Sequence, residues 1–299
     1  MKNHCFLCYS IDFVPLWIKG KYRIMMCNNC SFVFTVPLRS RKQMNKFYCT
    51  FDYSSSNEVE SIIRKDAKRS LTYIEKYVRK KGKLLDVGCG RGYFLDEARK
   101  TGWRIYGIDY SDNLINYAKN TLLLNVQRGD MFHFRSKQRF DVVTLNQVIE
   151  HVFNPNDLIK KCYELLKPGG VIYVATPNIG SVAAKVAREN FDHLIPPEHL
   201  GYFSKRTLSA VLQRNHFRAL YLGSWSYAVD LAGILKRLIK GKRKIDVLPK
   251  RKNIVEIQHS SFIKKIKLLL FDKIFCKLFY RILNFDCWGT ILEVVAVKV

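Results

Sequence analysis

The chain has 299 residues, 48% of them hydrophobic and 25% charged, which is the balance of a folded globular protein. Lys and Arg outnumber Asp and Glu by 51 to 25, and a net charge of +26 suggests an anionic partner such as nucleic acid or a membrane surface. The start has no apolar signal-peptide core, no segment has the composition of a membrane-spanning helix, and nine cysteines without a secretory signal favour a cytoplasmic location.

Four cysteines near the start form two pairs, Cys5-x2-Cys8 and Cys27-x2-Cys30, separated by 18 residues. This spacing is typical of a zinc ribbon, in which two hooks place four thiolates tetrahedrally around Zn²⁺. Four unrelated buried thiols are one alternative, which the doubled spacing disfavours. A redox-active pair is the other, and it is disfavoured because the pairs do not lie at a strand-to-helix junction. Because a closed shell of four thiolates leaves no catalytic position, we expect a structural zinc that stabilises a lobe at residues 1–48.

The next segment, residues 49–82, reads as an aromatic-rich connector followed by a polar helix over about 58–80. From residue 83 to 299, short apolar strands alternate with helices. This rhythm predicts an α/β fold, a doubly wound and mostly parallel Rossmann-type sheet with helices on both faces. In such sheets the ligand lies beyond the carboxyl ends of the strands.

The first of these strands leads into a glycine turn within residues 84–94. Gly88, Gly90 and Gly92 can adopt positive φ and leave room for a ligand on the backbone, next to a helix N-terminus. A dinucleotide fingerprint requires Gly-x-Gly-x-x-Gly, and here the third glycine comes one residue too early. Asp86 is also poorly suited to a diphosphate, and we expect it beside a cationic group of the ligand.

Polar residues follow the next three strands as well. Asp109 and Tyr110 end the second strand, Asp130 and Met131 follow the third, and Asn146 ends the fourth. An acid at the end of the second strand accepts hydrogen bonds from both ribose hydroxyls of a bound nucleoside.

These strand ends together resemble the class I S-adenosylmethionine-dependent methyltransferases, and residues 140–178 are typical of that family's fourth and fifth strands. The resemblance covers residues 83–178 closely and the remainder weakly. It implies methyl transfer, with S-adenosylmethionine bound by Asp86, Gly88, Gly90, Gly92, Asp109, Tyr110, Asp130, Met131 and Asn146.

Glu150 and His151 follow the fourth strand. They resemble a divalent-metal motif of some ubiquinone-biosynthesis O-methyltransferases and small-RNA methyltransferases, which carries another Glu three residues earlier. Here that position is Gln147, a neutral and weaker ligand for a hard cation. We therefore expect these residues to brace the loop, with metal-assisted catalysis as the alternative.

A Pro-rich loop after the fifth strand contains Glu198 and His199, just before a helix that Ser204 would cap. The pattern resembles sugar methyltransferases that carry an N-terminal zinc lobe. In the sugar C-methyltransferases a Glu-His pair at this point accepts the proton, so the resemblance implies that His199 is the general base and that Glu198 assists it. The alternative is a histidine that only hydrogen-bonds the loop.

Basic and large apolar residues are interleaved over residues 228–288, which we expect to be an insertion of amphipathic helices before a final antiparallel strand. The pattern suits helices lying on an anionic membrane, and equally a lid packed on the core.

The sequence thus predicts a cytoplasmic enzyme, peripheral at the inner membrane surface, that methylates a small molecule, a sugar or a lipid-linked glycan precursor. An RNA methyltransferase that uses the basic surface is the alternative. The Asn146-Gln-Val-Ile segment lacks the Asp/Asn-Pro-Pro-Tyr sequence common in base-amino methylation, which makes nucleic acid the weaker candidate. A binding protein without turnover is disfavoured because both cofactor acids are present. The sequence leaves open which acceptor is used and whether oxygen, nitrogen or carbon is methylated.

Overall fold

A computed structural model describes residues 4–38, 40–49, 57–227 and 287–299. The amphipathic insertion expected at 228–288 lies outside these residues, apart from its last two, so the membrane and lid interpretations stay predictions. Within the described ranges, no helix combines the length and the hydropathy needed to cross a lipid bilayer.

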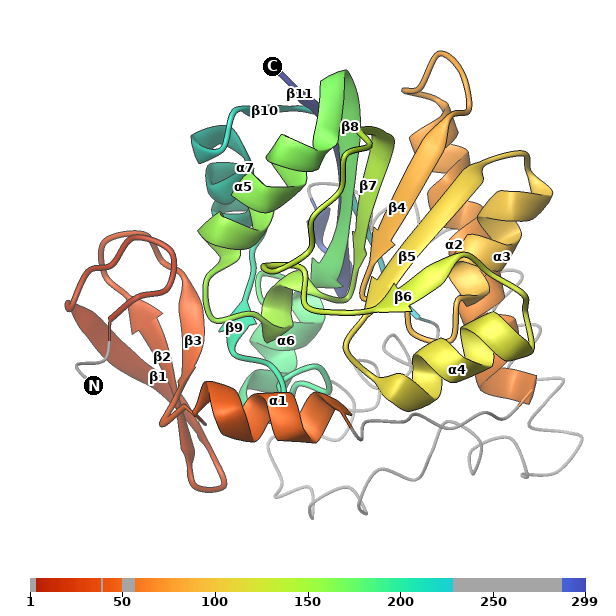
Figure 1. The fold of residues 1–299 in the computed structure, drawn as a ribbon. Helices are drawn as coiled ribbons and strands as arrows, with labels where there is room; N and C mark the ends of the chain where they lie inside the picture. Colours follow the sequence, from red (N-terminus) through yellow and green to blue (C-terminus); the bar gives the residue numbers. More distant parts are fainter. Residues whose placement is uncertain (1–3, 39, 50–56, 228–286) are drawn as a thin grey trace, which may run out of the picture.

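The main sheet has seven strands in the order β10-β11-β8-β7-β4-β5-β6 (Figure 1). Five of them run parallel, and β11 pairs antiparallel with both β8 and β10. The expected α/β class, the mostly parallel sheet and the antiparallel final strand are all confirmed. The strands are β4 (Lys83–Val87), β5 (Arg104–Asp109), β6 (Val126–Arg128), β7 (Phe140–Asn146), β8 (Leu166–Pro177), β10 (Phe217–Trp225) and β11 (Ile291–Lys298).

Helices cover both faces of this sheet because successive strand residues point to opposite sides. Leu84 packs with α2, α3 and α4, whereas its neighbour Leu85 packs with α5 and α7. Ser111 caps α4 and Ser204 caps α7, each accepting a bond from a backbone N–H of the first turn. The helices are α2 (Asn57–Glu75), α3 (Tyr93–Lys100), α4 (Asp112–Asn120), α5 (Pro155–Leu165), α6 (Val182–Ala187) and α7 (Lys205–Arg214), so α2 ends five residues before the expected boundary.

A buried ion pair joins α2 to the last strand. Arg69 of α2 bonds to Glu293 of β11, which is 1% exposed and also accepts a bond from the Tyr173 hydroxyl of β8 at 3.1 Å. The Arg69 guanidinium stacks over the Trp225 ring at 4.2 Å. Because a buried carboxylate without a partner is very costly, Glu293 requires Arg69 in this position.

The N-terminal lobe is a small antiparallel sheet. The two expected ribbon strands form β1 (Phe13–Lys19) and β2 (Tyr22–Cys27), which pair with each other. Two further strands were not predicted: β3 (Val33–Val36), and the two-residue β9 (Gly201–Tyr202) that comes from the loop before α7. The strands β1 to β3 are followed by α1 (Arg41–Cys49), a helix that the sequence did not indicate within the lobe expected at residues 1–48.

Candidate active site

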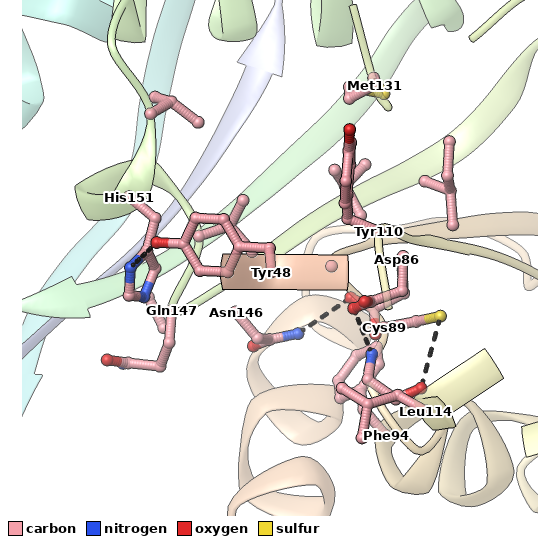
Figure 2. Close-up of a pocket in the computed structure, with 18 of the residues that line it drawn as sticks. Tyr48, Asp86, Cys89, Phe94, Tyr110, Leu114, Met131, Asn146, Gln147 and His151 are labelled. Atoms are coloured by element: carbon pink, nitrogen blue, oxygen red, sulfur yellow. Dashed lines mark hydrogen bonds between the residues drawn. The ribbon is translucent and has the colours of Figure 1, made fainter. Parts of the chain in front are cut away.

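A cavity of about 680 Å³ lies at the carboxyl ends of β4 to β7, where the fold predicts a ligand (Figure 2). Its volume is within the range of roughly 300–1,000 Å³ that small-molecule sites have. The loops after β4, β5, β6 and β7 form most of its wall, and side chains from α1, α2 and the end of β10 complete it.

The glycine turn after β4 forms one edge of this cavity. Gly88 has a φ of 71°, and a Cβ there would lie 2.6 Å from the side chain of Val148, so only glycine fits without displacement. Gly90 also lines the cavity, whereas Gly92 does not. Gly92 is instead the N-cap of α3, and a Cβ there would meet Leu124 at 2.4 Å. The third glycine is therefore needed for packing.

Asp109 lies at the end of β5 with both carboxylate oxygens held by the backbone. Its Oδ2 accepts from the Gly90 N–H at 2.8 Å, and its Oδ1 accepts from the Ser111 N–H at 2.9 Å. Burial raises the pKa of Asp109 even though these bonds oppose the shift. Each oxygen keeps a second lone pair, so the carboxylate can accept bonds from a pair of ligand hydroxyls.

Asp86 is buried at the end of β4, 2% exposed. Its Oδ1 accepts bonds from the Thr144 hydroxyl at 2.6 Å and from the Asn146 amide at 3.2 Å, both from β7. Burial raises the pKa of Asp86 to about 7, and the nearby charge of Asp109 adds to the rise. A cation in the cavity would therefore stabilise the ionised form of Asp86.

The remaining expected cofactor residues also line the cavity. Tyr110, Asp130 and Met131 all form part of its wall. Figure 2 shows Tyr110 and Met131 at the cavity. The Asp130 carboxylate accepts from the Phe132 N–H at 2.9 Å, which holds the turn after β6 in place.

A second group of titratable side chains lies beside the cavity. Glu150, His151 and His199 bring one carboxylate oxygen and two imidazole nitrogens within 4.8 Å of one another. The two imidazole rings are 4.8 Å apart, edge to face. His151 lines the cavity with a quarter of its side chain exposed, whereas His199 is 6% exposed and is not part of the wall.

Backbone carbonyls determine the tautomer of both imidazoles. The Nδ1 of His151 lies 2.9 Å from the carbonyl oxygen of Glu198, and the Nδ1 of His199 lies 2.8 Å from that of His193. A carbonyl oxygen can only accept, so in both rings Nδ1 carries the hydrogen. Each neutral ring therefore has its lone pair on Nε2. Burial lowers the pKa of His151 to about 4, which keeps this ring neutral at pH 7.

Glu150 completes the cluster from the buried side. Its side chain is 1% exposed, Oε2 accepts from the Thr176 hydroxyl at 2.9 Å, and Oε1 has no hydrogen-bond partner. Burial raises the pKa of Glu150 to about 8. The cluster thus presents one carboxyl group and two imidazole lone pairs, which can share a proton or act as three ligands of a divalent cation.

The structure arranges the expected catalytic residues differently from the sequence interpretation. Glu198 lines the cavity, but it is its backbone carbonyl that accepts a hydrogen bond from His151, and no bond described here joins its carboxylate to His199. Tyr48 of α1 is a site residue that the sequence did not indicate. Its hydroxyl lies 3.0 Å from Nδ1 of His151 and donates to the same Glu198 carbonyl at 3.2 Å (Figure 2).

The four expected metal-ligating cysteines lie together in the N-terminal lobe. Their sulfur atoms are within 4.8 Å of one another, with 3.5 Å between Cys5 and Cys30 and 3.5 Å between Cys8 and Cys27. Tetrahedral zinc with Zn–S bonds of about 2.3 Å separates its sulfurs by about 3.8 Å. The four thiols therefore fit a zinc ion.

Comparison with known proteins agrees with this geometry. A sequence model of a methyltransferase-domain family matches residues 59–222, more than half of the chain. A ubiquinone biosynthesis O-methyltransferase from Coxiella burnetii is 41% identical over 115 residues, which are 36% of this chain and 49% of that protein. The chain thus spans about half the length of the curated relatives it matches.

Solved structures show the same fold. A S-adenosylmethionine-dependent methyltransferase from Archaeoglobus fulgidus covers 80% of this chain and 94% of its own, with a TM-score of 0.51 and 18% identity. The match to magnesium protoporphyrin IX methyltransferase from Synechocystis PCC 6803, with S-adenosylhomocysteine bound, covers 87% of this chain and 100% of that chain, with a TM-score of 0.53 and 11% identity. With the family match, the parallel sheet and the cavity at its carboxyl edge, the chain belongs to the class I S-adenosylmethionine-dependent methyltransferases.

Proposed function

We propose that this methyltransferase acts on a small-molecule acceptor that loses a proton as it is methylated, and that His151 and His199 form the proton-accepting centre. The observation that carries the proposal is the convergence of one nitrogen from each imidazole and a carboxylate oxygen of Glu150, all within 4.8 Å of one another, beside a cavity of about 680 Å³. A cavity of that size suits a small acceptor, and the printed name of the Coxiella burnetii relative points in the same direction.

In this proposal the cofactor is held along the strand ends. Asp109 accepts bonds from the ribose hydroxyls, and Asp86 faces the cationic part of the cofactor. The glycine turn places its own backbone directly against the cofactor. Asn146 fixes Asp86, while Tyr110, Asp130 and Met131 border the adenine. When bound, S-adenosylmethionine supplies a methyl group that its sulfonium has already activated.

The chain's own part in the chemistry is then to align the acceptor and to remove its proton. His151 reaches the cavity, and the carbonyl of Glu198 keeps Nε2 of this ring unprotonated. His199 and Glu150 lie directly behind it and can share the proton that arrives. The sequence interpretation assigned the proton to His199 with the help of Glu198, whereas the contact between the two imidazole rings supports a pair in which His151 meets the acceptor first.

Two alternatives are outcomes of the same experiments. The cluster of Glu150, His151 and His199 could hold a divalent cation that activates the acceptor, which would make methyl transfer sensitive to chelators. An RNA acceptor would show as methylation that falls steeply with salt.

We also propose that the four N-terminal cysteines hold a structural zinc. The fit of their sulfur atoms to a tetrahedral ion supports this, as does the small size of the lobe they stabilise.

Asp109→Ala should weaken the binding of S-adenosylmethionine by about 1.5–3 kcal/mol, because hydrogen bonds to a charged group are lost. Isothermal titration calorimetry measures this. Asp112→Ala is the matched control, since the Asp112 side chain is 53% exposed and pairs with Arg128 outside the cavity wall. Equal affinity in the two variants would contradict the ribose assignment.

Binding of S-adenosylmethionine should release protons near pH 7. In the free protein the pKa of Asp86 is raised to about 7, so the group is partly protonated there, and a bound cation favours the ionised form. Affinity should therefore rise as the pH increases from 6 to 8. Calorimetry in two buffers of different ionisation enthalpy measures the release, which Asp86→Asn should reduce and Asp112→Asn should not.

His151→Ala and His199→Ala should each lower kcat by about 10²–10⁴-fold, the range for a lost general base, with cofactor affinity nearly unchanged. The assay follows labelled methyl transfer to a panel of hydroxylated small molecules and to RNA. His216→Ala is the control, because its ring lies beside Tyr163, outside the cavity wall. Full activity of both cluster variants would rule out the proposed centre, and restoration by Mg²⁺ or Mn²⁺ after chelation would assign it to metal.

Purified protein should contain one zinc per chain. Cys27→Ser should lose it and unfold the lobe, while the main sheet still binds cofactor. Elemental analysis and calorimetry measure the two effects. Cys162→Ala, which alters a core thiol of α5, should keep the zinc. If elemental analysis finds no zinc in wild-type protein that was purified without a chelator, the assignment of a structural zinc is wrong.

A further inference from the structure

We propose that Thr35 of the N-terminal lobe is a positioning residue for the histidine cluster, so that the lobe forms part of the acceptor side of the active site. The inference rests on the proposed role of His199. In this inference the lobe does more than hold its own zinc site: it also fixes the position of the segment that carries His199.

Hydrogen bonds from the hydroxyl and from the backbone N–H connect Thr35 to residues 199–202, the segment that carries His199. The Thr35 hydroxyl donates to the carbonyl of His199 at 3.0 Å, and its backbone N–H donates to the carbonyl of Leu200 at 3.0 Å. The Tyr202 hydroxyl lies 3.2 Å from the Thr35 hydroxyl and 3.3 Å from the His199 carbonyl, and it can donate its one hydrogen to either of them. Thr35 is completely buried, so water does not compete for these bonds.

The segment is held from the opposite side by the cluster itself. The Leu200 N–H donates to the backbone carbonyl of Glu150 at 2.8 Å. One short stretch of chain therefore lies between Thr35 of the lobe and Glu150 of the loop after β7. The pairing of β9 with β3 is limited to two residues, so we expect the Thr35 bonds to contribute much of the attachment of this segment to the lobe, and their loss to change the separation of His199 from Glu150 and His151.

Aromatic packing links the same segment to the cysteine site. The Phe32 ring lies against Gly201, where a Cβ would come within 2.5 Å of it, and 5.0 Å from the ring of Phe203. Phe32 follows Cys30 by two residues, and its carbonyl accepts from the Cys27 N–H at 2.9 Å. The second cysteine hook thus packs directly on the strand that follows His199.

The cofactor residues lie elsewhere. Asp86, Asp109 and the glycine turn are held by bonds within β4, β5 and β7, and no bond described for them comes from the lobe. Loss of the Thr35 contact should therefore alter the acceptor side and spare cofactor binding.

Thr35→Val tests the inference, because valine keeps the shape and removes the hydroxyl, and Thr35→Ser is the matched variant that restores it. We expect Thr35→Val to lower kcat by about 10–100-fold, the scale of a small misplacement of a reacting group, with the Kd for S-adenosylhomocysteine unchanged within twofold. Thr35→Ser should recover most of the activity.

A spectroscopic readout makes the test independent of the acceptor. The chain has seven histidines, so ring signals of ¹³C-histidine protein can be assigned with His151→Gln and His199→Gln. In Thr35→Val the His199 and His151 signals should shift while that of His133 stays. If Thr35→Val does not fold, Gly201→Ala, which pushes Phe32 off the segment, should produce the same shifts.

The outcomes separate this inference from the proposed function. Wild-type ring signals and wild-type kcat in Thr35→Val would overturn the positioning role. Shifted signals in Thr35→Val, together with full activity of His199→Ala, would support the positioning of His199 and overturn its catalytic role. A change in cofactor Kd equal to the change in kcat would show general destabilisation and would also overturn the inference.

Discussion

The parallel pairing of β4 with β5 on one side and with β7 on the other determines where ligands can be held in this molecule. In this register Asp86 lies opposite Gly107 of β5 and Thr144 of β7. The Thr144 hydroxyl can therefore donate to the Asp86 carboxylate across the strands, and Asn146 reaches the same oxygen from two residues further on. A buried acid in the middle of a sheet is tolerated because the neighbouring strands supply its donors.

The main sheet, the cofactor side of the cavity and the cysteine cluster could be predicted from the sequence because their signals are local. A glycine turn between a buried strand and a helix, an acid at the end of a strand, and a serine before a helix each act within a few residues. The cap at Ser204, the strands from β4 to β8 and the grouping of Cys5, Cys8, Cys27 and Cys30 could be predicted without any knowledge of distant contacts.

The rest depends on contacts between residues far apart in the chain. His199 was paired with its neighbour Glu198 on a resemblance, whereas its ring lies against His151, 48 residues earlier. A strand of two residues such as β9 is too short to show an alternating pattern in the sequence. It forms because β3 offers an edge on which it can pair. Tyr48 is likewise a single aromatic residue in a segment rich in them, and only the fold shows that its hydroxyl reaches the Glu198 carbonyl.

The ion pair between Arg69 and Glu293 has a consequence for how the chain folds during synthesis. Its two residues are 224 positions apart, and the strand that carries Glu293 comes last in chain order among the strands described, so it is synthesised after them. Until then β8 lacks its neighbour on one side, β10 has no partner in the sheet, and Arg69 of α2 has no carboxylate from β11. The sheet is therefore completed only once β11 has been synthesised, and between the synthesis of β8 and that of β11 a nascent chain would expose the unpaired edge of β8 to chaperones or to other chains.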